Sequence, residues 1–186
     1  MEDAGIIQLY WDRDEAAIAE SSGKYGAYCT AIAHNILHSA ADEEECVSDT
    51  WLRAWNAIPP QRPKVLASFF GKITRNLSID RYKKLRRQKR GGGQMEAVLE
   101  ELAECVSGRD DTEQAWDEKE LAAELGRFLQ GLAEDKRTLF ILRYWHAYSV
   151  SAIAGQVGMS ENNVSVTLSR IRARLKTYLI ERGFDV

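Results

Sequence analysis

The stretch YSVSAIAGQVGMSENNVSVTLSRIRARLKTYL, residues 148–179, decides the fold of the C-terminal half of this chain. Ser149 and Ser160 each precede a run with apolar residues at helical spacing, so each can cap the helix that follows. Gly158 lies between the two runs, where a tight turn needs a residue that tolerates a left-handed backbone. The stretch therefore predicts a helix-turn-helix motif.

Such a motif places its second helix in the major groove of DNA, where the exposed N-terminal residues of that helix meet base edges. The residues expected to read bases are Asn162, Asn163, Ser165, Val166 and Ser169. Cations further along the helix would bind phosphates without reading sequence, and they are Arg170, Arg172, Arg174 and Lys176. The alternative is a helical hairpin with a solvated basic face, which the caps and the turn together disfavour.

The rest of the chain carries the same helical periodicity, and its only prolines cluster at Pro59, Pro60 and Pro63. This pattern predicts an all-α fold. One helix would begin at Asp42, with Glu45 as its capping-box partner, and would stop before the prolines.

A second basic helix begins near Val65 and is ended by three glycines at 91–93. Its apolar stripe predicts that Phe69, Ile73, Leu77 and, less strictly, Ile79 face the core. Its cations are Lys72, Arg75, Arg81, Lys83, Lys84, Arg86, Arg87, Lys89 and Arg90, and they surround Phe69, Phe70, Asn76 and Tyr82. Cations interleaved with aromatic rings suit a single strand, because bases stack on rings while the backbone follows positive charge. A core phenylalanine beside a solvated basic face explains this helix alone equally well.

Between the two basic elements the chain is rich in Glu and Asp and poor in aromatic residues, which favours a linker, although VLEELAEC can form a short helix. We therefore predict two small helical domains, residues 1–90 and 112–186, joined by a flexible acidic linker at 91–111. The C-terminal domain would contain the helix-turn-helix.

Composition limits the remaining function classes. With 186 residues, 45% of them hydrophobic, the chain can bury a core, and its net charge of -3 hides two basic elements behind acids in the linker and at 42–49. Three cysteines without CxxC spacing argue against disulfides and favour a reducing cytoplasm. No apolar run approaches the ~20 residues of a membrane span, and the N-terminus is acidic where a signal peptide is basic. We expect a cytoplasmic protein without membrane insertion.

An enzyme is the least supported class. His34 and His38 lie four residues apart, with Glu44, Glu45 and Cys46 beyond them, but no second ligand pair follows, so ordinary histidines are favoured over a zinc site. The glycines at 91–93 follow a helix instead of a strand, which indicates a hinge and not a phosphate loop. We expect no catalytic activity, no cofactor and no metal.

Three stretches together resemble the extracytoplasmic-function group of bacterial RNA polymerase sigma factors. DEEECVSDTWLRAW is similar to the polymerase-binding helix of that family, SFFGKITRNLSID to its promoter-melting segment, and LRYWHAYSVSAIAGQVGMSENNVSVTLSRIRARL to its promoter-reading domain. The resemblance covers nearly the whole chain in the same order. It implies a dissociable subunit that binds core RNA polymerase and directs promoter-specific initiation, including strand opening.

The resemblance also implies roles for individual residues. The clamp helices of the largest polymerase subunit would face Glu45, Ser48, Asp49 and Arg53. The unpaired strand of the minus-ten element would enter the loop from Asn56 to Lys64 and the helix after it, at Asn56, Arg62, Lys64, Lys72, Arg75, Asn76, Arg81 and Lys84. The C-terminal domain would meet the polymerase flap and read the minus-thirty-five duplex with Asn162, Asn163, Ser165, Val166, Ser169, Arg170, Arg172 and Arg174. An anti-sigma factor that covers both domains is a further hypothesis.

Some positions depart from the family pattern. Ser48 stands where many relatives carry a long polar residue, and Ser165 and Thr167 stand where a lysine and an arginine often occur, so the promoter sequence does not carry over. One rival is a free-standing helix-turn-helix regulator that dimerises on a palindrome and does not bind polymerase. Another is a helical adaptor without DNA affinity, against which both basic helices argue.

Overall fold

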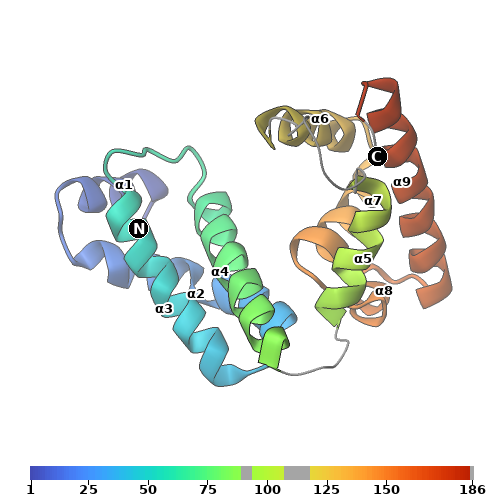
Figure 1. The fold of residues 1–186 in the computed structure, drawn as a ribbon. Coiled ribbons are helices and arrows are strands. Elements are labelled where there is room, and N and C mark those ends of the chain that lie inside the picture. Colours follow the sequence, from blue (N-terminus) through green and yellow to red (C-terminus); the bar gives the residue numbers. More distant parts are fainter. Residues whose placement is uncertain (89–93, 107–117, 185–186) are drawn as a thin grey trace. The chain divides into compact units, whose positions relative to one another are not determined.

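The computed structural model describes residues 1–88, 94–106 and 118–184, and within these ranges the chain is helical, with short connections and no strand (Figure 1). The chain divides into two compact units, Met1–Gly91 and Gly92–Val186. The prediction of an all-α protein with two small helical domains is confirmed. Every described helix is too short or too polar to cross a membrane.

The N-terminal unit is a bundle of four helices. They are α1 (Asp3–Trp11), α2 (Ala16–Leu37), α3 (Ala40–Ala57) and α4 (Leu66–Gln88). The last three pack pairwise on one another, and α1 packs on α2. The buried core between them consists of Ile6, Tyr10, Ala17, Cys29, Trp51, Ala54, Ile58, Leu66 and Phe70.

The core-facing side of α4 is wider than the predicted stripe. Phe70 is fully buried, with its ring centroid 5.3 Å from that of Trp51, whereas Phe69 is only half-buried. Phe69 and Ile73 pack against this core as partly buried side chains and Leu77 is buried, so the predicted stripe is confirmed at these three residues, and Phe70 adds a fully buried position beside it. A polar residue explains why the sequence did not single out Phe70: the hydroxyl of Thr74, four residues further along α4, is buried and lies 2.9 Å from that of Thr50, so this core position carries no hydrophobic signal.

The start of α3 also differs from expectation. The helix begins at Ala40 and its N-cap is Ser39, so the prediction that Asp42 caps it was wrong. The Asp42 carboxylate instead accepts a hydrogen bond from Nε of Arg81 on α4, at 2.7 Å. The Asp42 carboxylate thus lies inside the first turn and binds a partner on another helix, while the acidic first turn suits the helix dipole.

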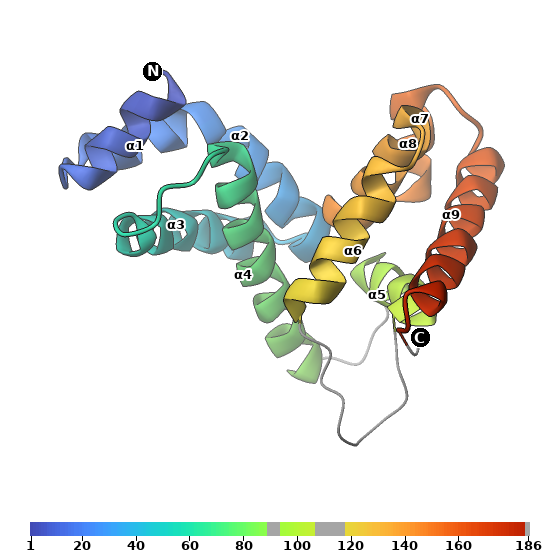
Figure 2. The same cartoon turned by 90° about the horizontal axis from the view of Figure 1, so that it is seen from above.

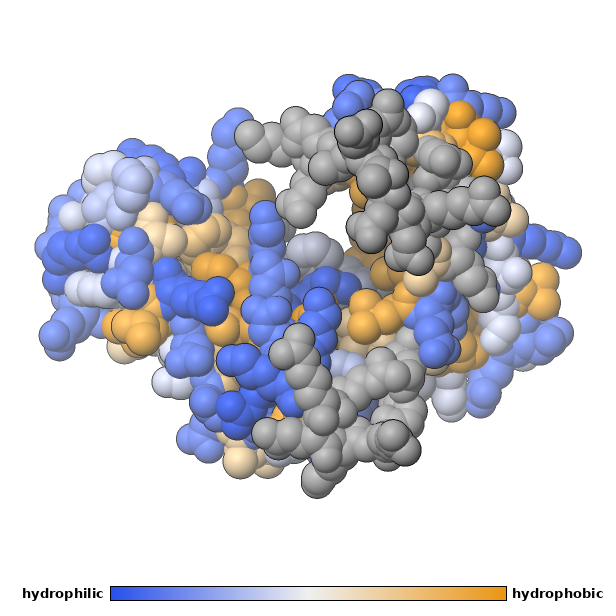
Figure 3. All heavy atoms as spheres, in the orientation of Figure 1, coloured by the Kyte–Doolittle hydropathy of each residue, from blue (hydrophilic) through white to orange (hydrophobic). Residues whose placement is uncertain are grey.

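The C-terminal unit is built around one long helix. Its elements are α5 (Gln94–Val106), α6 (Glu118–Gln130), α7 (Glu134–Phe140), the π-helical turn η1 (Ile141–Trp145), α8 (Val150–Val157) and α9 (Glu161–Glu181). Helix α9 contacts α5, α6, α7 and α8 (Figure 2). On the face drawn in Figure 3, hydrophilic side chains predominate and apolar ones form small patches, as expected where each unit buries its own core.

The helix-turn-helix is confirmed in its local details. Ser149 Oγ accepts from the Ala152 N–H at 3.0 Å, and Ser160 Oγ accepts from the Asn163 N–H at 3.3 Å, so both predicted caps form. Gly158 ends α8 with φ +69°, the left-handed conformation that the turn needs. These bonds lie within three residues of the capping side chain, which is why the sequence revealed them.

Helix α5 lies inside the range predicted as linker, 91–111. It packs on α9 and η1, and its Met95 and Val98 are buried. The predicted domain limits thus remain predictions, and α5 joins the C-terminal unit. The hinge at 91–93, the linker residues 107–111 and the cations Lys89 and Arg90 lie outside the described residues, as do the side chains of Arg86, Arg87 and Cys105.

Candidate nucleic-acid interface

The outward side of α3 gathers the residues expected to face the polymerase. We name as the α3 face the exposed residues Glu45, Ser48, Asp49, Leu52 and Arg53. Sequence reasoning missed Leu52, which is 58% exposed in the middle of this polar surface. Its spacing of three residues from Asp49 and four from Ser48 was the available signal. A single exposed leucine is common on protein surfaces, but Leu52 is the one large apolar side chain of the α3 face.

Arg81 and Glu45 were predicted to serve different partners, yet they bind each other. Arg81 Nη2 lies 2.8 Å from Glu45 Oε2 and 2.6 Å from Asp42 Oδ1. Hydrogen bonds from Ser39 and Arg81 hold the pKa of Asp42 below its ordinary value, and the bond to Asp42 raises the pKa of Arg81. Arg81 is thus engaged by carboxylates of α3, and the structure gives it a positioning role between α3 and α4.

An open pocket of about 480 Å³ lies between the C-terminal half of α3 and the N-terminal half of α4. We call it the α4 pocket, and its lining residues are Arg53, Asn56, Ala57, Gln61, Phe69, Lys72, Ile73 and Asn76. Its walls combine an aromatic ring, three side-chain amides and two cations. A volume within the roughly 300–1,000 Å³ range of small-molecule sites is ample for a nucleobase.

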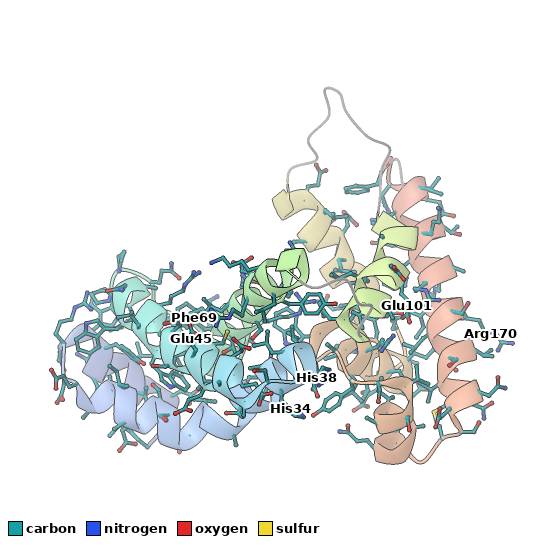
Figure 4. The ribbon with its side chains drawn as sticks, turned by 60° about the horizontal axis from the view of Figure 1, so that its bottom comes forward. His34, His38, Glu45, Phe69, Glu101 and Arg170 are labelled. Atoms are coloured by element: carbon teal, nitrogen blue, oxygen red, sulfur yellow. The ribbon has the colours of Figure 1, made fainter. Side chains whose placement is uncertain are left out.

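The α4 pocket is lined by only some of the residues predicted to bind the minus-ten strand. Asn56, Lys72 and Asn76 line it, and Arg53 joins them from the predicted polymerase set. The sequence did not single out Gln61, because it is an uncharged residue in a loop. The sequence left Phe69 undecided between core and stacking. Its side chain lines the pocket, and the residue is labelled in Figure 4.

The other predicted minus-ten residues lie elsewhere. Arg62 is exposed, with its guanidinium 5.0 Å from the ring centroid of Trp11 on α1. Lys64 and Lys84 are exposed, whereas Arg75 is half-buried and burial lowers its pKa. Three of these cations are thus exposed to solvent, whereas the guanidinium of Arg75 is partly buried.

The predicted reading face of α9 is open along most of its length. Its exposed members are Asn162, Asn163, Ser165, Val166, Ser169, Arg170 and Arg174, with Val166 39% exposed. Figure 4 shows Arg170 projecting from α9 on the side away from α5. Arg172 is the exception, since its Nη1 donates to the Tyr144 hydroxyl at 2.8 Å and to Glu101 at 3.3 Å.

Glu101 on α5 is the centre of this arrangement, and sequence reasoning missed it because it lies in the predicted linker. Arg143 Nη2 donates to one carboxylate oxygen at 2.6 Å, and Arg143 Nε and the Tyr144 hydroxyl donate to the other at 3.2 and 2.9 Å. Burial pushes the pKa of Glu101 upward, but the bonds from Arg143 and Tyr144 and the charge of Arg172 outweigh it and hold that pKa below its ordinary value. Burial and the nearby carboxylate raise the pKa of Tyr144.

The histidine pair has ordinary packing partners. His34 and His38 stack edge to face with ring centroids 5.6 Å apart, and His34 Nδ1 lies 3.0 Å from Glu43 Oε1. In the ranges that the structure describes, no three His, Cys, Asp or Glu side chains group as metal ligands. Burial raises the thiol pKa of Cys46, so it is a poor ligand or nucleophile where it stands.

Comparison with known proteins matches two family models to this chain. Sigma-70 region 2 matches residues 23–88, which span α2, α3 and α4, and Sigma-70, region 4 matches residues 116–175, which span α6 to most of α9. Helix α5 lies outside both matched ranges.

Two curated relatives and one solved structure are similar to the chain. The probable RNA polymerase sigma factor RfaY of Xanthomonas campestris pv. campestris is 29% identical over 157 residues, which are 84% of this chain and 38% of the relative. The RNA polymerase sigma-E factor of Streptomyces avermitilis is 36% identical over 91 residues, 49% of each protein. The chain thus spans less than half the length of either relative. The structure of CnrH in complex with the cytosolic domain of CnrY has a TM-score of 0.44 and 20% identity, and the match covers 96% of this chain and 97% of that one.

Proposed function

Because this chain belongs to the sigma-70 family, in its extracytoplasmic-function group, we propose that it binds core RNA polymerase and directs promoter-specific transcription initiation, including strand opening. The observation that carries the proposal is the presence of region 2 and region 4 in one chain, the first with a pocket lined by an aromatic ring and cations, the second with an open helix-turn-helix. The chain is a specificity subunit in this proposal, and the chemistry belongs to the polymerase. Its place of action is the cytoplasm.

The α3 face is the proposed contact with the clamp helices of the largest polymerase subunit. Leu52 supplies an apolar anchor, and the charged and polar residues around it supply the rim that excludes water. Because Glu45 also binds Arg81, the contact rests on a face whose position relative to α4 is held by an ion pair.

The α4 pocket is the proposed receptor for a base of the unpaired minus-ten strand. Extruding a base costs a few kcal/mol, and stacking on an aromatic ring returns about 1–3 kcal/mol per base. Phe69 is the stacking surface, the amides of Asn56, Gln61 and Asn76 meet the edge of the base, and Lys72 binds the backbone. Arg62, Lys64 and Lys84 extend the path of the strand, while Arg75 and Arg81 support α4.

The exposed face of α9 is the proposed reader of the minus-thirty-five duplex. Its asparagines suit the edge of adenine and the methyl groups of Val166 suit the methyl group of thymine, while Arg170 and Arg174 bind phosphates. The flap of the polymerase is a second proposed partner of this domain. An anti-sigma factor that covers both units is a proposed regulator.

Run-off transcription tests the proposal directly. Purified core polymerase transcribes a library of genomic fragments with and without this protein, and the transcript starts are sequenced. New starts that share two spaced upstream elements are the expected result. An unchanged set of starts, together with salt-sensitive binding of the protein alone to a palindromic duplex, would favour the free-standing regulator instead.

A further inference from the structure

Helix α5 occupies a place on the C-terminal unit that neither matched family region accounts for. It lies beside α9 (Figure 1) and packs on α9 and η1. Its Met95 is 1% exposed and its Val98 is fully buried. Among the described side chains of α5, Met95 and Val98 are the fully buried apolar ones, and a short helix with so small a buried apolar surface belongs to the elements that open locally at low cost.

The carboxylate of α5 neutralises cations of the domain on which it docks. Glu101 accepts hydrogen bonds from two nitrogens of Arg143, from the Tyr144 hydroxyl and from Arg172. Arg143 is itself deeply buried, with a side chain 5% exposed, and its Nη1 also donates to the backbone oxygen of Tyr148 just before the first helix of the helix-turn-helix. Loss of Glu101 would leave Arg143 with little compensation, so the docked state is favoured in the free protein.

Arg172 belongs to the helix that carries the reading face. It follows Ser169 by three residues and Ser165 by seven, a spacing that puts it on the flank of α9 where those two serines are exposed. The guanidinium of Arg172 donates hydrogen bonds to the Glu101 carboxylate and to the Tyr144 hydroxyl. In the docked state a negative charge therefore lies beside the proposed DNA surface, and one cation of that surface is engaged.

We propose that α5 is an internal cover of the C-terminal domain, which competes with duplex DNA for Arg172. When α5 is docked, Glu101 holds Arg172. When α5 leaves, the carboxylate goes with it and Arg172 binds a DNA phosphate. This inference rests on the proposed function of α9 in reading duplex DNA. It adds that the docking of α5 regulates the DNA affinity of that helix.

A matched pair of variants tests the competition in the full chain. Glu101→Gln removes the paired carboxylate, and Glu100→Gln removes an equal charge from the exposed neighbour on the same helix. The measurement is binding to a pool of mixed-sequence duplexes over a range of salt concentrations. Glu101→Gln should bind more tightly than Glu100→Gln and steepen the slope of log affinity against log salt by about 1, because one more phosphate contact forms. Their affinity ratio should fall roughly fourfold when salt rises fourfold.

A double variant and a hydrogen-exchange measurement distinguish competition between α5 and DNA from a role of α5 in stability alone. Glu101→Gln combined with Arg172→Gln should lose the extra slope. In the unaltered protein, amide hydrogen exchange in α5 should become faster when duplex is added, whereas a helix that only stabilises the domain would keep its protection. Equal binding by the two single variants, or unchanged protection of α5, overturns the cover while leaving the DNA-reading proposal intact. Absence of duplex binding by every form overturns both.

Discussion

Arg81 of α4 forms an ion pair with Glu45 of α3, with 2.8 Å between Nη2 and Oε2. The sequence assigned the two residues to different partners, DNA and polymerase. In the folded unit they join the helix that carries the α3 face to the helix that carries the α4 pocket. A change in either residue therefore acts on both surfaces through the position of the helices.

The first prediction separates Arg81 from an open cation of the same helix. Arg81→Ala should lower the Tm of the N-terminal unit slightly and leave the salt dependence of single-strand binding unchanged, because the pair is partly exposed and already neutralised. Lys84→Ala should leave Tm unchanged and reduce the salt slope by about 0.7, the value expected for one phosphate contact on a single strand. Thermal unfolding and strand-binding titrations check both, and a reduced slope for Arg81→Ala would contradict the positioning role.

The second prediction distinguishes two adjacent phenylalanines. Phe70→Ala should lower the free energy of unfolding by about 3–5 kcal/mol, since it removes a fully buried ring from the core. Phe69→Ala should cost much less stability and instead impair promoter opening, because its half-buried ring lines the α4 pocket. Urea unfolding measures the first quantity, and permanganate reactivity of the minus-ten thymines measures the second. Normal opening with Phe69→Ala would remove Phe69 from the proposed stacking role.

The third prediction divides polymerase binding from strand opening. Leu52→Ala should weaken binding to core polymerase by about 1–2 kcal/mol, the usual range for an interface anchor, without unfolding the domain, because the side chain is 58% exposed. Asp49→Arg should also weaken binding. Lys72→Ala with Asn76→Ala should spare binding and slow opening. Competition binding to core polymerase and opening kinetics at saturating protein provide the two readouts, and equal effects of both sets on both steps would refute the division.

The fourth prediction concerns acid. Because the pKa of Glu101 lies below its ordinary value of 4.5 in the folded domain, its ionised form stabilises the domain fully above about pH 4.5 and the stabilisation is lost as the pH falls through the folded pKa. The Tm of the C-terminal unit should therefore fall on acidification below pH 4.5. Glu101→Gln should show a shallower fall than Glu100→Gln in the same scan. Parallel curves for the two variants would mean that another group controls acid unfolding.

The fifth prediction contrasts phosphate contacts with base contacts on α9. Arg170→Ala and Arg174→Ala should each weaken binding to all duplexes alike and lower the salt slope by about 1. Val166→Ala should leave the slope unchanged and relax the preference at one base pair, at a cost of about 1–3 kcal/mol for the preferred site. Binding selections from a randomised duplex pool reveal the difference. A uniform loss for Val166→Ala would assign it to packing instead of reading.

The sequence by itself determined the features that depend on near neighbours. Ser149, Ser160 and Gly158 define the helix-turn-helix because their capping bonds and backbone conformation involve residues at most three or four positions away. Helical periodicity likewise predicted the all-α class and the two domains. The same periodicity found Phe69, Ile73 and Leu77 but did not single out the fully buried Phe70, since the buried Thr74 beside it carries no hydrophobic signal and the hydroxyl partner of Thr74, Thr50, is on another helix.

Only the tertiary structure decided which charges are open and which are engaged. Arg81 and Arg172 are arginines on basic helices, which is why the sequence assigned them to DNA. Their carboxylate partners, however, lie 36 and 71 residues away in the chain. Glu101 in turn meets Arg143 across 42 residues, which is why an acidic stretch with the composition of a linker contains a docked helix. A charge does not specify its partner through local sequence, because Coulomb attraction depends on distance in space and on burial, and both are set when the helices pack.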